Sequence, residues 1–339
     1  MSIERNYLKK VANSVVLVLV VVMMASSLVG CASFAMSVGG NTSDKTSICF
    51  ITNDVEQPYR KLLAEGIQKA AEDAGVSFSL ELCGDDVDSQ IKKVESAAAS
   101  GKYDALVCRL VDKTTILQVE VAAGDLPIAF VNNEPSTDYL KADKYIFAGS
   151  YEQEAGRYQA EYVWNKLGKP STLNAIILEG APGHSGTIGR TKAVKNFFAD
   201  NNVDLNIVFM DYAKWTAEGA IEKLDMFKIT NQDFDCIFCN NDTMALGAVQ
   251  WLKDNGYNPA DYPVTGVDAT ADGCALVKSG DMYMTVLQDA KGQGNAAVQA
   301  CIKMANGQSI TSVDGASEDS KYVWVPFVPV DASNVAQYQ

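Results

Sequence analysis

The stretch Cys236-Ile-Phe-Cys-Asn-Asn-Asp-Thr-Met-Ala-Leu-Gly-Ala248 places two kinds of secondary structure next to each other. Residues 236–239 are all apolar, which predicts a buried strand. Residues 243–255 carry small and apolar side chains at helical spacing, and the polar residues 240–242 stand where the N-cap of that helix is expected. A buried strand that leads directly into a helix is typical of an α/β fold with a parallel sheet.

The same alternation of strand and helix runs outward from this stretch in both directions. For a first lobe we predict strands at 47–52, 76–82, 105–110, 128–132 and 145–149, and helices at 58–74, 88–100 and 114–123. For a second lobe we predict helices at 152–167, 189–201, 217–228, 243–255 and 271–279, and strands at 174–178, 203–211, 236–239, 264–267 and 284–287. A helix at 292–306 and one last strand at 323–328 follow. The pattern predicts two similar α/β lobes, each a parallel sheet with helices on both faces, joined by several crossings. In such sheets, ligands bind at the carboxyl ends of the strands.

The first thirty residues have the composition of an export signal. Arg5, Lys9 and Lys10 precede the apolar segment 11–24, and this segment leads to Leu28-Val29-Gly30-Cys31. The last four residues resemble a bacterial lipobox, in which the cysteine takes the lipid and becomes the first residue. The alternative is a transmembrane anchor, since 11–30 is almost long enough to span a bilayer. We predict an exported lipoprotein that is anchored through Cys31 to the outer face of the cytoplasmic membrane.

These patterns divide the chain into four parts. A signal peptide at 1–30 is followed by a tether at 31–45, which is rich in Gly, Ser, Thr and Asn. We assign 46–148 and 289–321 to the N-terminal lobe, and 149–288 and 322–339 to the C-terminal lobe.

Composition excludes several functions for these 339 residues. The 28 basic and 42 acidic side chains give a net charge of −14, which disfavours binding to nucleic acid or to anionic lipid. The single histidine, His184, excludes a histidine-rich metal site. The common motifs of enzymes are missing from the sequence, so we predict a protein that is not an enzyme and holds no cofactor or metal.

The cysteines other than Cys31 are interpreted as small buried apolar residues, because most lie in or beside apolar runs. Cys236 and Cys239 form a C-x-x-C pair. In a strand, this odd separation places the two side chains on opposite faces, so we do not expect them to share a disulfide or a metal ion.

Four stretches carry a resemblance to a known family: Pro58-Tyr59, the stretch from Asn240 to Ala248, Gly266-Val267-Asp268, and Thr285-Val286-Leu287-Gln288-Asp289. Together they resemble the type I periplasmic sugar-binding proteins of ABC importers. Further stretches are similar to the glucose/galactose-binding group: 130–135, 178–184 with the Arg190 that follows, Lys214-Trp215, and 276–280. The resemblance covers about residues 46–331. It implies a two-lobed flytrap with three hinge crossings, a monosaccharide of the galactose or glucose type as ligand, a membrane permease as partner, and a monomer.

The resemblance also implies a binding site. Tyr59 and Trp215 would sandwich a pyranose ring, since aromatic rings cover the flat C–H faces of a sugar. The polar candidates for the hydroxyl rim are Gln57, Arg109, His184, Arg190, Asn241, Asp268 and Gln288. Of the neighbours Asn241 and Asp242, we expect one to cap the helix and the other to face the ligand.

Some of these positions depart from the glucose/galactose pattern. Gln57 and Gly186 replace acidic residues, Arg109 replaces an asparagine, and Gln288 replaces an asparagine as in the ribose proteins. Asp54 or Glu56 could supply one of the missing acceptors. Arg109 could bind the carboxylate of an acidic sugar such as a uronic acid, or form a salt bridge with Asp112 or Asp86.

Two further alternatives concern the class of the protein. A chemoreceptor or sensor-kinase component would use the same ligand-induced closure, and the sequence does not separate it from a transport protein. A transcriptional repressor is disfavoured, because the chain has an export signal and no basic helix-turn-helix. The calcium loop of the glucose/galactose group is replaced by the short segment 167–172, which lacks the spaced oxygen ligands, so no calcium is expected there.

Overall fold

The structure is a computed structural model that describes residues 45–338. These residues belong to one compact unit, Ser43–Gln339. The predicted signal peptide, the lipid attachment site Cys31 and nearly all of the predicted tether lie outside the described residues.

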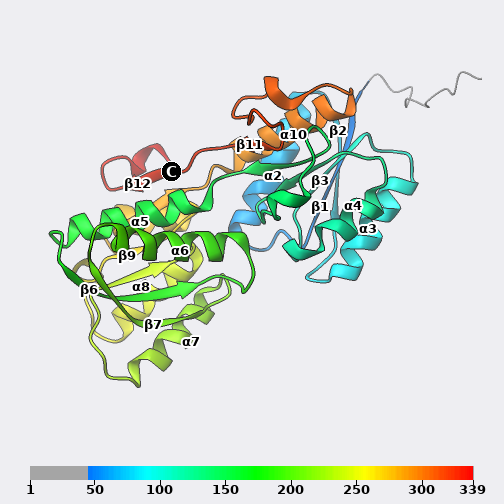
Figure 1. Cartoon of the computed structure of the whole chain (residues 1–339). Helices are drawn as coiled ribbons and strands as arrows, with labels where there is room; N and C mark the ends of the chain where they lie inside the picture. The colour runs from blue at the N-terminus through cyan, green and yellow to red at the C-terminus, as the bar shows by residue number, and fades with distance from the viewer. Residues whose placement is uncertain (1–44, 339) are drawn as a thin grey trace, which may run out of the picture. The chain divides into compact units, whose positions relative to one another are not determined.

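The first lobe contains a fully parallel sheet (Figure 1). Its strands are β1 (Ser47–Thr52), β2 (Ser77–Leu82), β3 (Ala105–Cys108), β4 (Ile128–Val131), β5 (Tyr145–Gly149) and β11 (Tyr322–Trp324), in the order β11-β5-β4-β3-β1-β2. Helices α2 (Pro58–Asp73) and α10 (Ala290–Ala305) pack on one face, and α3 (Val87–Ala99) and α4 (Ile116–Ala123) pack on the other.

The second lobe repeats this arrangement. Its strands are β6 (Thr172–Glu179), β7 (Asp204–Tyr212), β8 (Cys236–Cys239), β9 (Val264–Thr265), β10 (Met284–Leu287) and β12 (Val328–Asp331), in the order β12-β10-β9-β8-β6-β7. Its helices are α5 (Glu152–Lys166), α6 (Ser185–Asp200), α7 (Ala217–Lys228), α8 (Asp242–Asp254) and α9 (Ala271–Ser279). Only β12 runs antiparallel to its neighbour, β10. The predicted fold of two α/β lobes with mostly parallel sheets is therefore confirmed.

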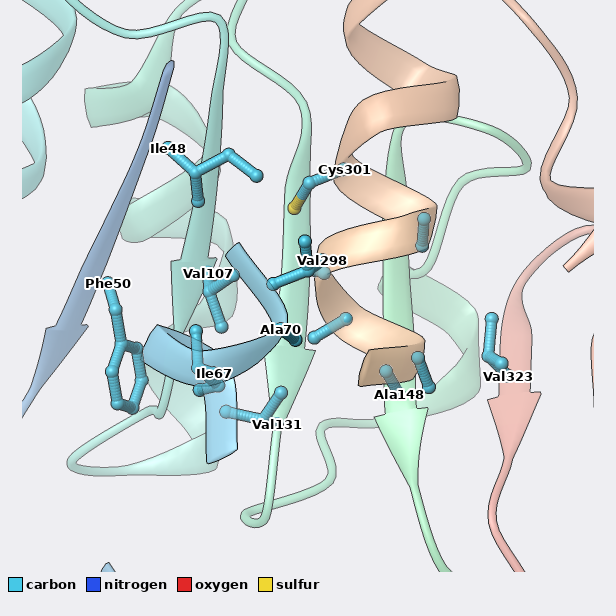
Figure 2. Close-up of a cluster of buried hydrophobic side chains, with 14 of the residues drawn as sticks. Ile48, Phe50, Ile67, Ala70, Val107, Val131, Ala148, Val298, Cys301 and Val323 are labelled. Atoms are coloured by element: carbon cyan, nitrogen blue, oxygen red, sulfur yellow. The ribbon is translucent and has the colours of Figure 1, made fainter. Parts of the chain in front are cut away.

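Alternating side chains of β1 explain why both faces of the first sheet are covered. Ile48 and Phe50 point toward α2 and α10, where Ile67 and Val298 close the cluster (Figure 2). Ile51 lies in the separate cluster on the opposite face. Because all four residues of β3 and β4 are also buried, these strands are continuous apolar runs, as expected for a parallel sheet between two helix layers.

Two glycines let α2 and α10 approach each other closely (Figure 1). A Cβ atom on Gly66 would lie 2.7 Å from the backbone oxygen of Ala290, and one on Gly294 would lie 2.5 Å from the carbonyl carbon of Gly66. This contact ties α10, which follows the second lobe in the chain, to the first lobe.

The seven cysteines of the described range are buried and free of disulfides, which confirms their interpretation as small apolar residues. Cys236 belongs to the cluster beside α5 and α6, and Cys239 belongs to the cluster beside α7 and α8. The two side chains lie on opposite faces of β8, as their spacing predicts.

The prediction of a single last strand at 323–328 was wrong. β11 pairs with β5 in the first sheet, and β12 pairs with β10 in the second. Residues 322–330 contain no charged side chain, so they form one apolar run in the sequence, but the two ends of this run pair with strands of different sheets. Tyr322–Trp324 therefore belong to the first sheet, and the chain crosses between the lobes at 150–151, 288–289 and 325–327.

Candidate ligand-binding site

All nine residues predicted for the site line one cavity, together with Arg60 and Asn132, which were not predicted. The first lobe contributes Gln57, Tyr59, Arg60, Arg109 and Asn132; the second lobe and its crossing contribute His184, Arg190, Trp215, Asn241, Asp268 and Gln288. About 330 Å³ of space lies between these side chains, partly continuous with solvent, and the centre of a water molecule reaches about 30 Å³ of it. The side chains therefore close tightly around this space.

Strand ends explain why these residues meet. Arg109 follows β3 and Asn132 follows β4 in the first sheet, while Asn241 and Asp268 come shortly after β8 and β9 in the second. The carboxyl ends of parallel strands form one edge of each sheet, which is where ligands bind in open α/β folds. The two edges face the same cavity.

Tyr59 lines the cavity, and its hydroxyl is hydrogen-bonded within the protein. The hydroxyl donates to Oε1 of Gln293 at 2.7 Å, and Nε2 of Gln293 donates to Ser150 in the first crossing at 2.9 Å. Burial raises the pKa of Tyr59 well above its ordinary value, and the nearby carboxylate of Asp268 adds to this. Sequence reasoning missed Gln293, because a glutamine in the first turns of a helix is not distinctive.

Trp215 belongs to the apolar core of the second lobe and also lines the cavity. The edge of one ring meets the face of the other where Trp215 contacts His184, with ring centroids 5.1 Å apart. Gly180 lies against the indole, and a Cβ atom at that position would be 2.1 Å from Cζ2 of Trp215. Trp215 therefore contributes both to the core of the second lobe and to the wall of the cavity.

Three cavity residues have a left-handed backbone, which non-glycine residues adopt rarely. The φ angles are 61° at Asn132, 69° at Trp215 and 117° at Asp268. Conformations of this kind cost about 1–3 kcal/mol each and cluster at functional sites, where the surrounding structure holds them. Their convergence on one cavity supports a functional role that the residue types alone do not reveal.

Arg190 is held in place by three acceptors. Its Nε donates to Oε2 of Glu152 at 2.7 Å, its Nη1 to the carbonyl of Asn240 at 2.5 Å, and its Nη2 to Oε1 of Gln288 at 3.0 Å. Burial opposes the charge of Arg190, but the carboxylates of Glu152 and Asp268 outweigh it and raise the pKa of Arg190. Glu152 was also missed, because an acidic residue in the first turn of a helix has an ordinary explanation in the helix dipole.

Arg109 contacts neutral groups. Its Nε donates to Oδ1 of Asn132 at 2.7 Å, its Nη1 donates to Oδ1 of Asn53, and its Nη2 lies 3.2 Å from Nε2 of His184. Burial lowers the pKa of Arg109 to about 9, and the charge of Arg60 contributes, while the carboxylates of Asp54 and Asp85 oppose this.

The predicted alternative of a salt bridge from Arg109 is wrong for both partners considered. Asp86 accepts from the backbone N–H of Ser89 at the start of α3, and Asp112 accepts from that of Thr114. Within residues 45–338, no carboxylate lies within ion-pair distance of Arg109.

His184 is the N-cap of α6, which begins at Ser185, four residues earlier than the predicted helix start. Its Nδ1 accepts from the backbone N–H of Gly186 at 3.1 Å, so the imidazole acts as the N-cap. The glycine and proline residues at 180–183 indicate a loop that continues past His184, whereas the cap and the tertiary contacts start the helix at Ser185. Burial lowers the pKa of His184 well below its ordinary value, and the nearby arginines Arg109 and Arg190 add to this, so the ring is neutral.

Asn241 and Asp242 divide their roles differently from the prediction. Asn241 both caps α8, by accepting from the N–H of Met244 at 2.9 Å, and lines the cavity. Asp242 lies behind the cavity wall, where its carboxylate accepts from the hydroxyl of Thr285 at 2.6 Å and from the N–H of Thr270 at 2.8 Å. It therefore braces the loop that carries Asp268.

The two acidic residues considered as replacement acceptors do not line the cavity. Asp54 forms an ion pair with Arg60 and accepts from the N–H of Glu56 at 3.0 Å. Gln57 does line the cavity and makes no capping hydrogen bond at the start of α2.

The lobes also touch beside the cavity, through the start of α6. The hydroxyl of Ser185 accepts from the backbone N–H of Glu134 at 2.9 Å, and the N–H of Ser185 donates to Oδ1 of Asn133 at 3.2 Å. Glu134 and Glu152 line a groove at this junction. Burial raises the pKa of Glu134 to about 7, and the carboxylate of Glu152 adds to this, while Lys113 and Tyr322 oppose it.

Glu134 is expected to make stability depend on pH. The folded protein holds the proton of this carboxyl more tightly than the unfolded chain does. The protonated carboxyl of Glu134 therefore contributes fully to the free energy of unfolding below about pH 4.5, and this contribution is lost as the pH rises to about 7. The melting temperature should fall less between about pH 5 and about pH 8 in Glu134→Gln than in the wild type. Glu95→Gln, at an exposed glutamate of α3, should leave the wild-type decline unchanged. An equal decline in all three proteins would assign the pH dependence to other groups.

Two mostly parallel sheets, three crossings and a cavity lined from both lobes define a two-lobed solute-binding protein. Residues 48–309 match the family described as the periplasmic binding protein domain. The chain belongs to this family. Among residues 45–338, no helix has the length and apolar character needed to span a bilayer.

Known proteins similar to this chain are described as binding proteins for different ligands. It is 28% identical over 289 residues to a protein of Rhizobium meliloti provisionally described as rhizopine-binding, covering 84% of this chain and 89% of that protein. It is 28% identical over 247 residues to the D-galactose/methyl-galactoside binding periplasmic protein MglB of Haemophilus influenzae, covering 69% and 74%. A solved ABC transporter solute binding protein from Bacillus halodurans with bound myo-inositol is 26% identical, with a TM-score of 0.77 and coverage of 88% and 99%.

Proposed function

We propose that this protein is the extracytoplasmic binding component of an ABC sugar importer and that it holds one monosaccharide between its lobes. The observation that carries the proposal is the convergence of two aromatic residues and nine polar residues, from both lobes, on one cavity. The similarity to galactose- and inositol-binding proteins supports a cyclic polyhydroxylated ligand.

The chemistry of the lining matches the two surfaces of a pyranose. The rings of Tyr59 and Trp215 are suited to the apolar C–H faces. Asp268 and Asn241, with a carboxylate and a free amide nitrogen, are suited to the hydroxyl rim. On this basis we propose a sugar with a hexose-sized pyranose ring, and galactose and glucose are the neutral compounds against which other sugars are compared.

A screen for ligands tests the proposal directly. A ligand that binds only the folded protein raises its melting temperature by mass action. We expect at least one compound from a panel of hexoses, pentoses, inositols and uronic acids to raise the melting temperature in a concentration-dependent way and to bind with one-to-one stoichiometry in calorimetry. A panel without any binder would contradict the proposal.

Ligand binding should also favour the closed arrangement of the lobes. A ligand shifts this equilibrium only by its differential affinity for the closed state, and here the lining comes from both lobes. Small-angle scattering should therefore show a smaller radius of gyration after the ligand from the screen is added. An unchanged radius at saturation would contradict a flytrap mechanism.

The anchor is a separate part of the proposal. We propose that Cys31 carries the lipid and that residues 1–30 are removed, because Leu28-Val29-Gly30-Cys31 resembles a lipobox. Mass spectrometry of protein from the cell envelope should find a lipidated N-terminal peptide that starts at Cys31. Cys31→Ser should lack the lipid and leave the membrane fraction. Unmodified Cys31 in the mature wild-type protein would exclude this anchor.

A further inference from the structure

We infer that the ligand of this cavity is an acidic sugar whose carboxylate binds Arg109, with His184 as a second donor. This inference rests on the proposed function, because it specifies the chemical class of the ligand for the same site. Its basis is the pairing of charges and hydrogen bonds around the cavity.

The charges that line the cavity are paired unevenly. Arg60 forms an ion pair with Asp54, and Arg190 forms one with Glu152. Arg109 is only 4% exposed and has neutral partners within residues 45–338. A buried cation without an anionic partner carries a large desolvation penalty, which an anionic ligand would offset.

Asp268 does not neutralise Arg109. It is contributed by the other lobe, and its carboxylate has no hydrogen-bond donor within the described part of the chain. Burial raises the pKa of Asp268 well above its ordinary value, and Asp242 and Glu152 add to this against the opposing charge of Arg190. The carboxylates that act on Arg109 from a distance, Asp54 and Asp85, do not outweigh its burial, and neither lies within ion-pair distance of it, so no carboxylate of residues 45–338 in direct contact with it offsets its charge.

The side chains of His184 and Arg109 meet through two nitrogen atoms that both carry hydrogen. Because Nδ1 of His184 accepts from the N–H of Gly186, the neutral ring carries its proton on Nε2. That Nε2–H lies 3.2 Å from Nη2 of Arg109, which is itself a donor. Neither group has an acceptor in this contact. One ligand oxygen that accepts from both would resolve it, and a carboxylate oxygen is the strongest such acceptor.

The remaining polar groups are also mostly donors. Three residues that line the cavity, Asn132, Asn241 and Gln288, already accept hydrogen bonds through their side-chain oxygens from Arg109, Met244 and Arg190. Their amide nitrogens are the groups that remain to donate to a ligand. Nε2 of Gln288 and Nε of Arg60 are buried and have no hydrogen-bond partner. A ligand with more acceptors than donors satisfies this lining better than a neutral hexose does.

A hexuronic acid combines these requirements. Its carboxylate would accept from Arg109 and His184, its hydroxyls would donate to Asp268, and its ring would lie against Tyr59 and Trp215. The carboxylate is the feature that separates it from galactose or glucose, so Arg109 is the residue that determines this preference.

Calorimetry at neutral pH with galacturonate, glucuronate, galactose and glucose tests the inference. The wild type should bind at least one uronate about tenfold or more tighter than the matching hexose, the effect of one charge-assisted hydrogen bond. Arg109→Asn should lose at least about tenfold in uronate affinity while galactose affinity stays equal or improves. Arg109→Lys should keep a preference for the acid. Arg157→Asn, which removes the same charge from an exposed position of α5, should leave the uronate-to-hexose ratio unchanged.

The outcomes separate the two levels of the proposal. If the wild type binds a neutral sugar and prefers it to every uronate, the acidic ligand is excluded and the proposed sugar-binding function stands. The same holds if Arg109→Asn folds normally and keeps the wild-type ratio. If Arg109→Asn does not fold, the wild-type ratio and Arg109→Lys decide. If no uronate, hexose, pentose or inositol binds, the proposed function fails together with the inference.

Discussion

Glu152→Gln is expected to lower the free energy of unfolding by about 3–5 kcal/mol, the cost of removing one partner of a buried ion pair. The side chains of Glu152 and Arg190 are both nearly inaccessible to solvent, and their charged atoms are 2.7 Å apart. The substitution keeps the shape and removes the charge, which leaves the guanidinium of Arg190 buried without its ion-pair partner. The midpoint of urea unfolding, followed by tryptophan fluorescence and circular dichroism, would measure the loss.

A matched control lies on the same helix. Glu161 pairs with Arg157 at 2.8 Å, but both side chains are more than two-fifths exposed. Exposed pairs of this spacing contribute about 0.3–0.5 kcal/mol, so Glu161→Gln should be close to neutral. Similar losses for the two variants would show that burial does not set the strength of the Glu152–Arg190 pair. Because Arg190 also lines the cavity, Glu152→Gln should weaken ligand binding, whereas Glu161→Gln should leave it unchanged.

Trp215→Ala is expected to weaken ligand binding by about 1.5–3 kcal/mol, the value of burying one large apolar side chain. This corresponds to about one to two decades in the dissociation constant. The indole lines the cavity, contacts His184 and packs against Gly180, so its loss removes the ligand contact and the support of His184 together. Calorimetry with the ligand found in the screen would measure the change, and the melting temperature would report the loss of core packing.

The opposite wall provides a matched comparison. Tyr59→Ala should weaken binding by a similar amount, whereas Tyr59→Phe keeps the ring and loses only the hydrogen bond to Gln293. Tyr59→Phe should therefore retain most of the affinity. Wild-type affinity in both alanine variants would contradict the proposal that the rings of Tyr59 and Trp215 contact the ligand.

The sequence was sufficient for the elements and for most of the cavity lining. The alternation of strands and helices can be predicted from the spacing of apolar residues within each segment, without knowledge of the rest of the fold. The predicted elements match the structure except at the last strand and at the start of α6. The nine candidate residues were predicted mainly from motifs that resemble those of the periplasmic sugar-binding proteins, and such motifs can be recognised without knowledge of tertiary contacts.

The partners of these residues could not be predicted in this way. Glu152 and Gln293 look like ordinary helical residues, and only packing shows that they orient Arg190 and Tyr59. Arg109 had two acidic candidates as ion-pair partners, Asp86 and Asp112, yet the fold places it against Asn53 and His184. Asp86 and Asp112 instead accept from the backbone at the start of local turns and helices.

By itself, the sequence determined two α/β lobes, an export signal pattern at the N-terminus, and a set of aromatic and polar residues suited to a sugar. Only the tertiary structure decided which donors meet which acceptors. Arg190 reaches Gln288 across 98 residues, and Arg109 reaches His184 across 75. The spacing of apolar residues in a segment predicts which of its faces is buried. The balance of charges and hydrogen bonds in the cavity depends instead on side chains from distant segments, which meet only when both sheets have formed and the lobes have closed.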